Sequence, residues 1–327
     1  MSREFESVLV TGAAGFVGAN VVRELLIQGR RVHAILRSAQ LPWRLADVGT
    51  RQLVVHQADI ADAAAVRKAL RAARPDVVLH LATHGAYESQ ADGRTILQTN
   101  VLGSFNLLQA CADNGVRLFV NAGSSSEYGL QPEPMYEDMK LSPNSFYAVA
   151  KAAQTHLCAL FAQRASMAAA CFRLFSVYGP WEEPTRLIPT MIRRARAGLQ
   201  LEMVEPRIAR DFVYVQDVVS ALIDFPRLAE LRGEIINLGT GEETTLSEVV
   251  AAVKELLDSS SPVRWAAMAP RQWDSHRWVA DPARAAQRLG WAPRHTFRQG
   301  LARMARWMQS VGDHYGREAS EVLARAA

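Results

Sequence analysis

The sequence is poor in cysteine and contains no long apolar run. Its three cysteines, Cys111, Cys158 and Cys171, stand in apolar contexts without C-x-x-C spacing. This pattern predicts buried thiols in a reducing compartment rather than disulfides or metal ligands. No apolar run approaches the roughly 18 residues that a membrane span needs, and residues 1–6 lack the basic and apolar regions of a signal peptide. These absences predict a cytoplasmic protein.

Lysine is also scarce, although the chain carries a formal net charge of +4. The four lysines are Lys68, Lys140, Lys151 and Lys254. Arginine supplies the rest of the positive charge and is scattered over many expected helices. Such scatter indicates a solvated surface, so we expect no nucleic-acid partner. His80 and His84 flank the end of an expected strand without a third ligand at suitable spacing, so we expect no metal.

The length of the chain predicts two hydrophobic cores. Its 327 residues exceed the roughly 250 to 300 at which a single core stops growing. Hydrophobic residues make up 49% of the chain, which is enough for both cores. We expect a dinucleotide-binding domain over residues 1–175. A smaller, interleaved substrate-binding domain is expected over residues 176–327, with some of its segments returning to the first.

Near the N-terminus an apolar strand leads into three spaced glycines and then into an apolar helix. The turn and the helix start comprise Gly12, Gly15, Phe16, Val17 and Gly18. Glycines permit a tight turn, close approach of the backbone to a pyrophosphate and close packing of helix on strand. The N-terminus of the helix directs N–H groups at the anion. The turn therefore predicts a bound dinucleotide.

Strands and helices alternate along the first half of the chain. Strands are expected at residues 8–10, 31–36, 53–56, 76–81, 117–121 and 169–174. Helices are expected at residues 17–28, 62–73, 93–114 and 187–198, and a short strand at 235–237. This order predicts an α/β fold, a Rossmann-type doubly wound parallel sheet with helices on both faces.

The end of the second expected strand bears on the choice of cofactor. An acid about 20 residues past the glycines favours NAD, whereas an arginine accommodates the 2′-phosphate of NADP. Arg37 and Ser38 stand there, so NADP(H) is favoured over NAD(H), the alternative being that Arg37 points into solvent. We place Asp59 and Ile60 at the cofactor, although Asp59 or Asp62 can instead cap the following helix.

Acid–base chemistry is indicated by Tyr147 and Lys151, which lie one turn apart on one face of an expected helix. A tyrosine with a pKa near 10 is a poor base at neutral pH. A neighbouring ammonium and a positive nicotinamide ring would stabilise the phenolate. The serine cluster Ser124–Ser126 follows the preceding strand.

Several motifs, in this order, resemble the extended short-chain dehydrogenase/reductases, and more narrowly their sugar-nucleotide epimerase/dehydratase branch. The resemblance runs from residue 7 to about residue 308. The motifs are Thr11–Gly18, His80-Leu81-Ala82, Asn100–Gly103, Ser124–Gly129, Tyr147–Lys151, Arg173 with Val177–Pro180, and Arg210–Val215.

The resemblance implies roles for individual residues. Ser124, Tyr147 and Lys151 would be catalytic, with Ser124 binding the sugar oxygen that becomes a carbonyl. Leu81 and Ala82 would pass along the nicotinamide half of the cofactor. Arg210 and Arg271 would bind the nucleotide diphosphate, and the sugar would meet Thr83, Ser125 and Ser126. Asn100 would be structural. The family also suggests a homodimer formed through helices 93–114 and 147–165.

Two departures from the family bear on the reaction. Dehydratases of this branch follow the Ser/Thr with an acidic pair, but here Ser125 and Ser126 stand there and Glu127 is displaced by one residue. Ser176 occupies a position where many epimerases carry asparagine. We expect NADPH-dependent reduction of a nucleotide-linked 4-keto-6-deoxy sugar. The alternatives are an NAD(P)-dependent 4-epimerase, a 4,6-dehydratase and a non-enzymatic NADP-binding sensor.

Overall fold

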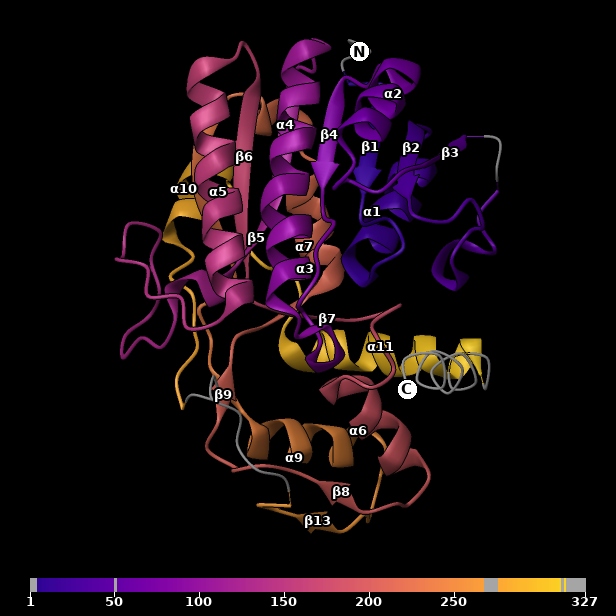
Figure 1. The fold of residues 1–327 in the computed structure, drawn as a ribbon. Helices are drawn as coiled ribbons and strands as arrows, with labels where there is room; N and C mark the ends of the chain where they lie inside the picture. Colours follow the sequence, from indigo (N-terminus) through magenta and orange to yellow (C-terminus); the bar gives the residue numbers. More distant parts are fainter. Residues whose placement is uncertain (1–4, 50–51, 268–275, 313–314, 316–327) are drawn as a thin grey trace.

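A seven-stranded parallel sheet forms the larger part of the computed structural model, which describes residues 5–49, 52–267, 276–312 and 315 (Figure 1). The strands are β1 (Ser7–Thr11), β2 (Arg31–Leu36), β3 (Leu53–Gln57), β4 (Val77–His80), β5 (Leu118–Ser124), β6 (Ala168–Leu174) and β11 (Arg232–Leu238). Their order is β11-β6-β5-β4-β1-β2-β3. After β1 the chain adds β2 and β3 on one side of β1, and then adds β4, β5, β6 and β11 on the other side of β1. The order thus reverses between β1 and β4, where doubly wound sheets bind their ligands.

Helices cover both faces of this sheet, as predicted. One face packs on α1 (Phe16–Ile27), α7 (Val215–Leu222), α8 (Phe225–Leu228) and α10 (Ala283–Leu289). The other packs on α2 (Ala63–Ala73), α4 (Gly103–Asp113) and α5 (Phe146–Arg164). The inner strands are mostly apolar because they are buried on both faces, and their buried polar side chains include His80, Asn121 and Arg173. Cys111, Cys158 and Cys171 are buried free thiols, in agreement with the prediction.

The helix expected at residues 93–114 is interrupted. The chain forms α3 (Gly93–Leu97), a π-helical turn (Gln98–Leu102) and then α4. Asn100 lies in the turn, where its amide accepts from the His84 N–H at 2.8 Å and donates to the His84 carbonyl at 2.8 Å. Asn100 is therefore structural, as expected, and its role is to hold the loop that follows β4.

The smaller part lies beyond the carboxyl ends of the sheet strands (Figure 1). Its helices are α6 (Leu187–Arg196), α9 (Leu246–Leu256) and α11 (Phe297–Val311), which share one apolar core. Three strand pairs accompany them: β7 (Ser176–Tyr178) with β10 (Phe212–Tyr214), β9 (Ala209–Arg210) with β12 (Thr244–Thr245), and β8 (Leu201–Glu202) with β13 (Val263–Arg264). In the described part of the chain, no helix combines the length and apolarity needed to cross a membrane.

Candidate active site

The glycine turn is packed against the end of β4. Gly12 has φ +71°, and a Cβ added there would lie 2.5 Å from the Ala82 nitrogen and the Leu81 carbonyl. A Cβ on Gly18 would lie 2.1 Å from the Gly12 oxygen. This turn, which we call the cradle, therefore has no room for a side chain at either glycine, and it lies directly before the N-terminus of α1. This geometry fits the pyrophosphate of a dinucleotide.

Arg37 and Ser38 are exposed immediately after β2. Burial lowers the pKa of His84, and the positive charge of Arg37 lowers it further, so the guanidinium lies on the side of the β4 loop. Arg44 has a different role. Its buried guanidinium donates to the Ala14 carbonyl at 3.3 Å and the Trp181 carbonyl at 2.7 Å, and thereby ties the glycine turn to the smaller part.

The end of β3 distinguishes the two aspartates. Asp62 caps α2, since its carboxylate accepts from two N–H groups of the first turn at 2.8 and 3.1 Å. Asp59 is exposed at the strand end and accepts from the Ala61 N–H at 2.8 Å. The Ile60 side chain is buried and packs against Gly103.

The three residues expected to be catalytic lie close together. Ser124 ends β5, while Tyr147 and Lys151 lie on the first turns of α5, whose N-cap Ser145 accepts from the Ala148 N–H at 3.1 Å. Burial raises the pKa of Tyr147, and hydrogen bonds to Ser124 and Thr83 oppose the rise. The Lys151 Nζ lies 6.0 Å from the centre of the Tyr147 ring.

Lys151 is buried, and its ammonium makes two hydrogen bonds to the protein. Nζ donates to the Ala122 carbonyl at 2.8 Å and to the Gln154 Oε1 at 2.9 Å. Burial lowers the pKa of Lys151 to about 8, and the carboxylate of Glu127 opposes the fall. An ammonium has three donors, so one N–H is left for a ligand such as a ribose hydroxyl.

Glu127, the acid displaced by one position, lies in the core. It is fully buried and forms an ion pair with Arg173 at 2.9 Å. Its Oε1 accepts from the Ser124 N–H at 2.8 Å and from the Thr155 hydroxyl at 3.1 Å. With these partners the carboxylate holds the backbone of the Ser124–Ser126 cluster from the core side. It is unavailable to remove a proton from a sugar.

The residues expected to contact the substrate differ in exposure, since Ser125 is buried and Ser126 is half-buried. The Ser126 hydroxyl lies 2.7 Å from that of Ser124, and the Ser125 hydroxyl accepts from the Trp278 Nε1 at 2.9 Å. The guanidinium carbon of Arg210 lies 5.7 Å from the centre of the Trp278 ring. Arg271, also expected to bind the diphosphate, lies outside the described residues.

The sequence reasoning missed two neighbours of this site. Arg186, at the start of α6, lies near enough to Tyr147 to oppose the rise in its pKa. Gln154 was missed although it lies three residues after Lys151 on α5, a spacing that places both on one helix face. No local sequence signal marks Arg186, because its approach depends on the fold of the loop after β7.

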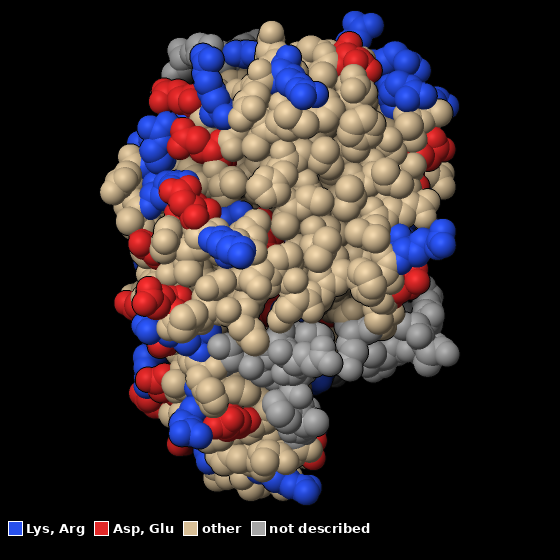
Figure 2. Space-filling view, turned by 60° about the vertical axis from the view of Figure 1, so that its left-hand side comes forward, with Lys and Arg blue, Asp and Glu red and all other residues tan. Residues whose placement is uncertain are grey.

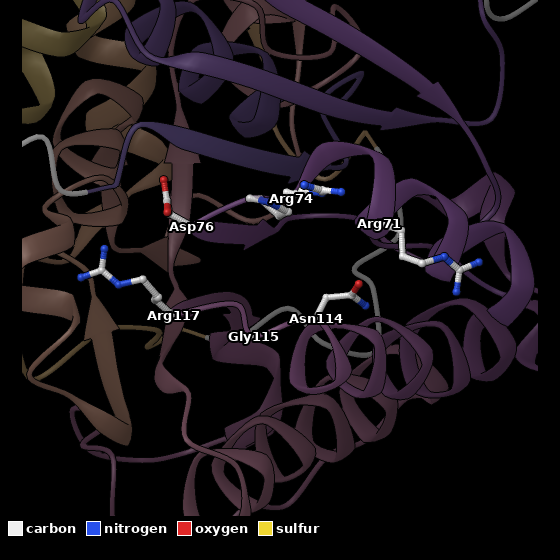
Figure 3. Close-up of a pocket in the computed structure, with 7 residues that line it drawn as sticks. Arg71, Arg74, Asp76, Asn114, Gly115 and Arg117 are labelled. Atoms are coloured by element: carbon white, nitrogen blue, oxygen red, sulfur yellow. The ribbon is translucent and has the colours of Figure 1, made fainter.

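A cavity of about 410 Å³ lies at the opposite edge of the sheet, near the starts of β4 and β5. Figure 3 shows that Arg71 and Arg117 extend to opposite sides of it. Its lining residues precede β4 and β5, whereas Ser124 stands at the end of β5, so this cavity is separate from the active site.

Comparison with known proteins decides the family. The family model described as "NAD dependent epimerase/dehydratase family" matches residues 8–239. The chain belongs to this family. It is 31% identical over 324 residues to a dTDP-glucose 4,6-dehydratase of Xanthomonas campestris pv. campestris, covering 91% of this chain and 92% of the relative. The predicted family, fold and enzyme class are thereby confirmed.

Solved structures of the epimerase/dehydratase family agree with this assignment. MoeE5 in complex with UDP-glucose and NAD has a TM-score of 0.82 and 34% identity, covering 93% of this chain and 99% of MoeE5. The Thermus thermophilus UDP-glucose 4-epimerase complex with NAD has a TM-score of 0.82 and 29% identity, over 93% and 99%. These relatives give no support to ketosugar reduction, our leading expectation, and favour the epimerase and dehydratase alternatives.

Proposed function

We propose that the protein is a nucleotide-sugar 4-epimerase, which oxidises the sugar at C4 and then reduces it from the other face. One contrast within a single loop carries the proposal. Ser124 lies at the Tyr147 phenol, whereas Glu127 is held in the core by Arg173. The loop therefore offers a hydroxyl, that of Ser124, to hold the C4 oxygen during oxidation and reduction. It offers no acid for the elimination of water, which disfavours 4,6-dehydration.

Tyr147 is the proposed acid and base. Its phenolate takes the proton of the C4 hydroxyl, and after inversion the phenol returns that proton to the alkoxide. Ser124 holds the reacting oxygen, and the Lys151 ammonium stabilises the phenolate. The glycine turn Gly12–Gly18 and the segment at Leu81 and Ala82 would hold a nicotinamide dinucleotide, which would supply reversible hydride transfer at C4 with no net redox change.

The substrate we propose is a sugar linked to a nucleoside diphosphate, because the two solved relatives described above are a UDP-glucose complex and a UDP-glucose 4-epimerase. Arg210 is proposed for the diphosphate, since a guanidinium donates bidentately to phosphate oxygens. Arg271 remains a prediction for the same role. The sugar is expected to meet Thr83, Ser125 and Ser126.

One observation favours a second candidate, NADPH-dependent reduction of a 4-keto sugar. Arg37 and Ser38 are exposed where a 2′-phosphate would lie, and no carboxylate stands at either position. The relatives named above hold NAD. A preference for NADP(H) over NAD(H) is therefore a proposal of its own, which direct binding measurements can test.

A homodimer is proposed from an apolar face on α4, α5 and the preceding π-helical turn. Its exposed side chains are Leu102, Phe105, Phe146, Val149 and Leu160. Figure 2 shows a broad area with few charged groups on the side of the molecule that carries α5. Burying such a face stabilises association. Light scattering should give twice the chain mass, and Phe105→Glu should shift the mass toward that of one chain.

Product analysis separates the candidate reactions. The purified protein, loaded with NAD or NADP, is incubated with UDP-glucose, UDP-glucuronic acid or dTDP-glucose, and the products are read by NMR. The epimerase predicts inversion at C4 without accumulation of reduced cofactor. A 4-keto-6-deoxy product would establish the dehydratase. Stoichiometric loss of NADPH on an isolated 4-keto sugar, without inversion of intact substrates, would establish the reductase and overturn our proposal.

A further inference from the structure

A chain of buried hydrogen bonds links the lysine of the active site to the strand that precedes the glycine turn. It runs from the Lys151 Nζ to the Gln154 Oε1 at 2.9 Å, and from the Gln154 Nε2 to the Ser104 Oγ at 2.9 Å. The Ser104 Oγ lies 2.8 Å from the His80 Nε2, and the His80 Nδ1 lies 2.7 Å from the Thr11 Oγ1. All five side chains are buried.

Counting donors and acceptors assigns the position of each proton in this series of hydrogen bonds. The Ser104 hydroxyl donates to the Asn100 carbonyl, so its oxygen accepts both from Gln154 and from the protonated Nε2 of His80. The His80 Nδ1 then accepts from the Thr11 hydroxyl, whose oxygen accepts from the Ala82 N–H at 3.2 Å. The opposite tautomer leaves the Thr11 proton without an acceptor among the described residues.

The network favours one protonation state of His80. Burial lowers the pKa of His80 to about 3, and the nearby Lys151 ammonium lowers it further. A charged imidazole would also lose the Nδ1 lone pair that accepts from Thr11. His80 is therefore neutral at working pH and holds Ser104 in one orientation, which in turn orients the Gln154 amide.

We propose that Gln154 is a positioning residue for the reaction. It fixes the Lys151 ammonium at Tyr147 through a neutral acceptor, and Ser104 and His80 fix Gln154. Through Thr11 and the Ala82 N–H, the same chain ties this lysine to the end of β4, against which Gly12 packs. The proposed consequence is that the two halves of the cofactor cleft, the glycine turn and the lysine, are held at one fixed separation.

The side chain of Gln154 is neutral, and this matters for the titration of Lys151 because few charged groups surround the ammonium. The titratable groups that face Lys151 are Glu127, His80 and Tyr147, and Tyr147 also faces Arg186. A glutamate in place of Gln154 would add an anion about 3 Å from the ammonium. That anion would favour the protonated forms of both the lysine and the tyrosine.

The inference rests on the proposed role of Lys151 as partner of Tyr147, so part of the test does not need turnover. In the wild-type protein, ¹⁵N spectra of labelled histidine should show His80 protonated at Nε2 and unprotonated at Nδ1 from pH 8 down to pH 5. A protonated Nδ1, or a charged ring at pH 6, would overturn the assigned chain even if the protein has no epimerase activity.

Variants of Gln154 test the positioning role. With Gln154→Glu, the ¹³Cε titration midpoint of Lys151 and the pH midpoint of the reaction should both rise by at least about one pH unit. Gln154→Leu should slow the reaction roughly tenfold to a hundredfold through misplacement of the ammonium. The matched control is Gln163→Glu, which adds the same charge at an exposed position of α5 and should shift neither midpoint.

The outcomes separate the two proposals. Unchanged midpoints in Gln154→Glu together with an unchanged rate in Gln154→Leu would reduce Gln154 to a packing residue and overturn the inference. If no variant, including the wild type, turns over any sugar tested, the epimerase proposal fails while the histidine spectrum and the lysine titration still decide whether the network exists. Unfolding midpoints of each variant separate loss of positioning from loss of fold.

Discussion

The sheet half and the smaller half of this protein are built by different kinds of contact. In the sheet half, neighbouring strands are joined by hydrogen bonds over four to seven residue positions, and strands such as β1 and β3 are followed directly by a helix that covers the sheet. In the smaller half, strand pairs such as β8 with β13 match only two positions, between segments about sixty residues apart. Regular structure carried by local patterns is readable from sequence; structure made by distant short segments is not.

The chemistry divides along the same line. The cradle, Tyr147 and Lys151 belong to the sheet half, where strand ends and one helix face determine their positions. Arg210, which we propose for the diphosphate, lies on β9 in the smaller half, and its guanidinium carbon is 5.7 Å from the centre of the Trp278 ring. Substitutions in the interior of the sheet half should therefore affect the chemical step or the fold. Substitutions of exposed residues at the ends of its strands should affect the choice of ligand.

The largest effect is expected from Tyr147→Phe, which removes the proposed acid and base. Turnover should fall by roughly a hundredfold to ten-thousandfold, while cofactor binding is retained. Progress curves and cofactor titration check the two parts. Tyr136→Phe, which changes an exposed tyrosine, serves as the control and should leave turnover unchanged. Full activity of Tyr147→Phe would remove this residue from the mechanism.

Glu127→Gln should lower the free energy of unfolding by about 3–5 kcal/mol, because it leaves the Arg173 guanidinium buried without its anion. The control is Glu255→Gln, which breaks the exposed pair with Arg298 and should cost less than about 1 kcal/mol. Urea unfolding measures both. A stable Glu127→Gln protein that has lost activity would instead assign Glu127 a direct role in chemistry.

Gly12→Ala and Gly29→Ala form a matched pair, since the two glycines have φ +71° and +75°. At Gly29 nothing lies within 4 Å of the added Cβ, so only backbone strain of about 1–2 kcal/mol is expected. At Gly12 the Cβ would collide with Leu81 and Ala82, so cofactor affinity should also fall at least about tenfold. Equal cofactor affinity in the two variants would show that the cradle is not the binding site.

Acid should weaken the sheet half first. Among the described residues, the histidines whose pKa is lowered by burial are His33, His56, His80 and His84, all in that half. For His80 the pKa is about 3 when folded against an ordinary 6.5, so its stabilising effect is complete above pH 6.5 and declines as the pH falls. The decline should reach about 2 kcal/mol at pH 5. Hydrogen exchange at pH 7 and pH 5, resolved by segment, would locate the loss; equal loss in both halves would contradict this assignment.

The smallest effect is expected at the cofactor ribose. Arg37→Asp should shift the ratio of NADP to NAD affinity toward NAD by roughly tenfold. Arg71→Asp makes the same charge change at the opposite edge of the sheet and should leave the ratio unchanged. Isothermal titration with each dinucleotide provides the measurement. An unchanged ratio in Arg37→Asp would mean that this guanidinium points into solvent and does not bind the 2′-phosphate.

Much of the sheet half was predictable, including its parallel strands, its helices on both faces and the closeness of Ser124, Tyr147 and Lys151. The π-helical turn at Asn100 was not, because it serves a hydrogen bond to a loop sixteen residues away. The burial of Glu127 could not be predicted either, since its partner Arg173 lies 46 residues further along the chain.

By itself the sequence determined the local structures: the glycine turn, the alternation of strands and helices, and the one-turn spacing of Tyr147 and Lys151. Those follow from backbone sterics and from periodicities of two and 3.6 residues, which act over a few neighbours. Only the tertiary structure decided which acid is buried, which histidine tautomer is held and which arginines are engaged. Those outcomes depend on burial and on partners that the chain brings together only when it folds.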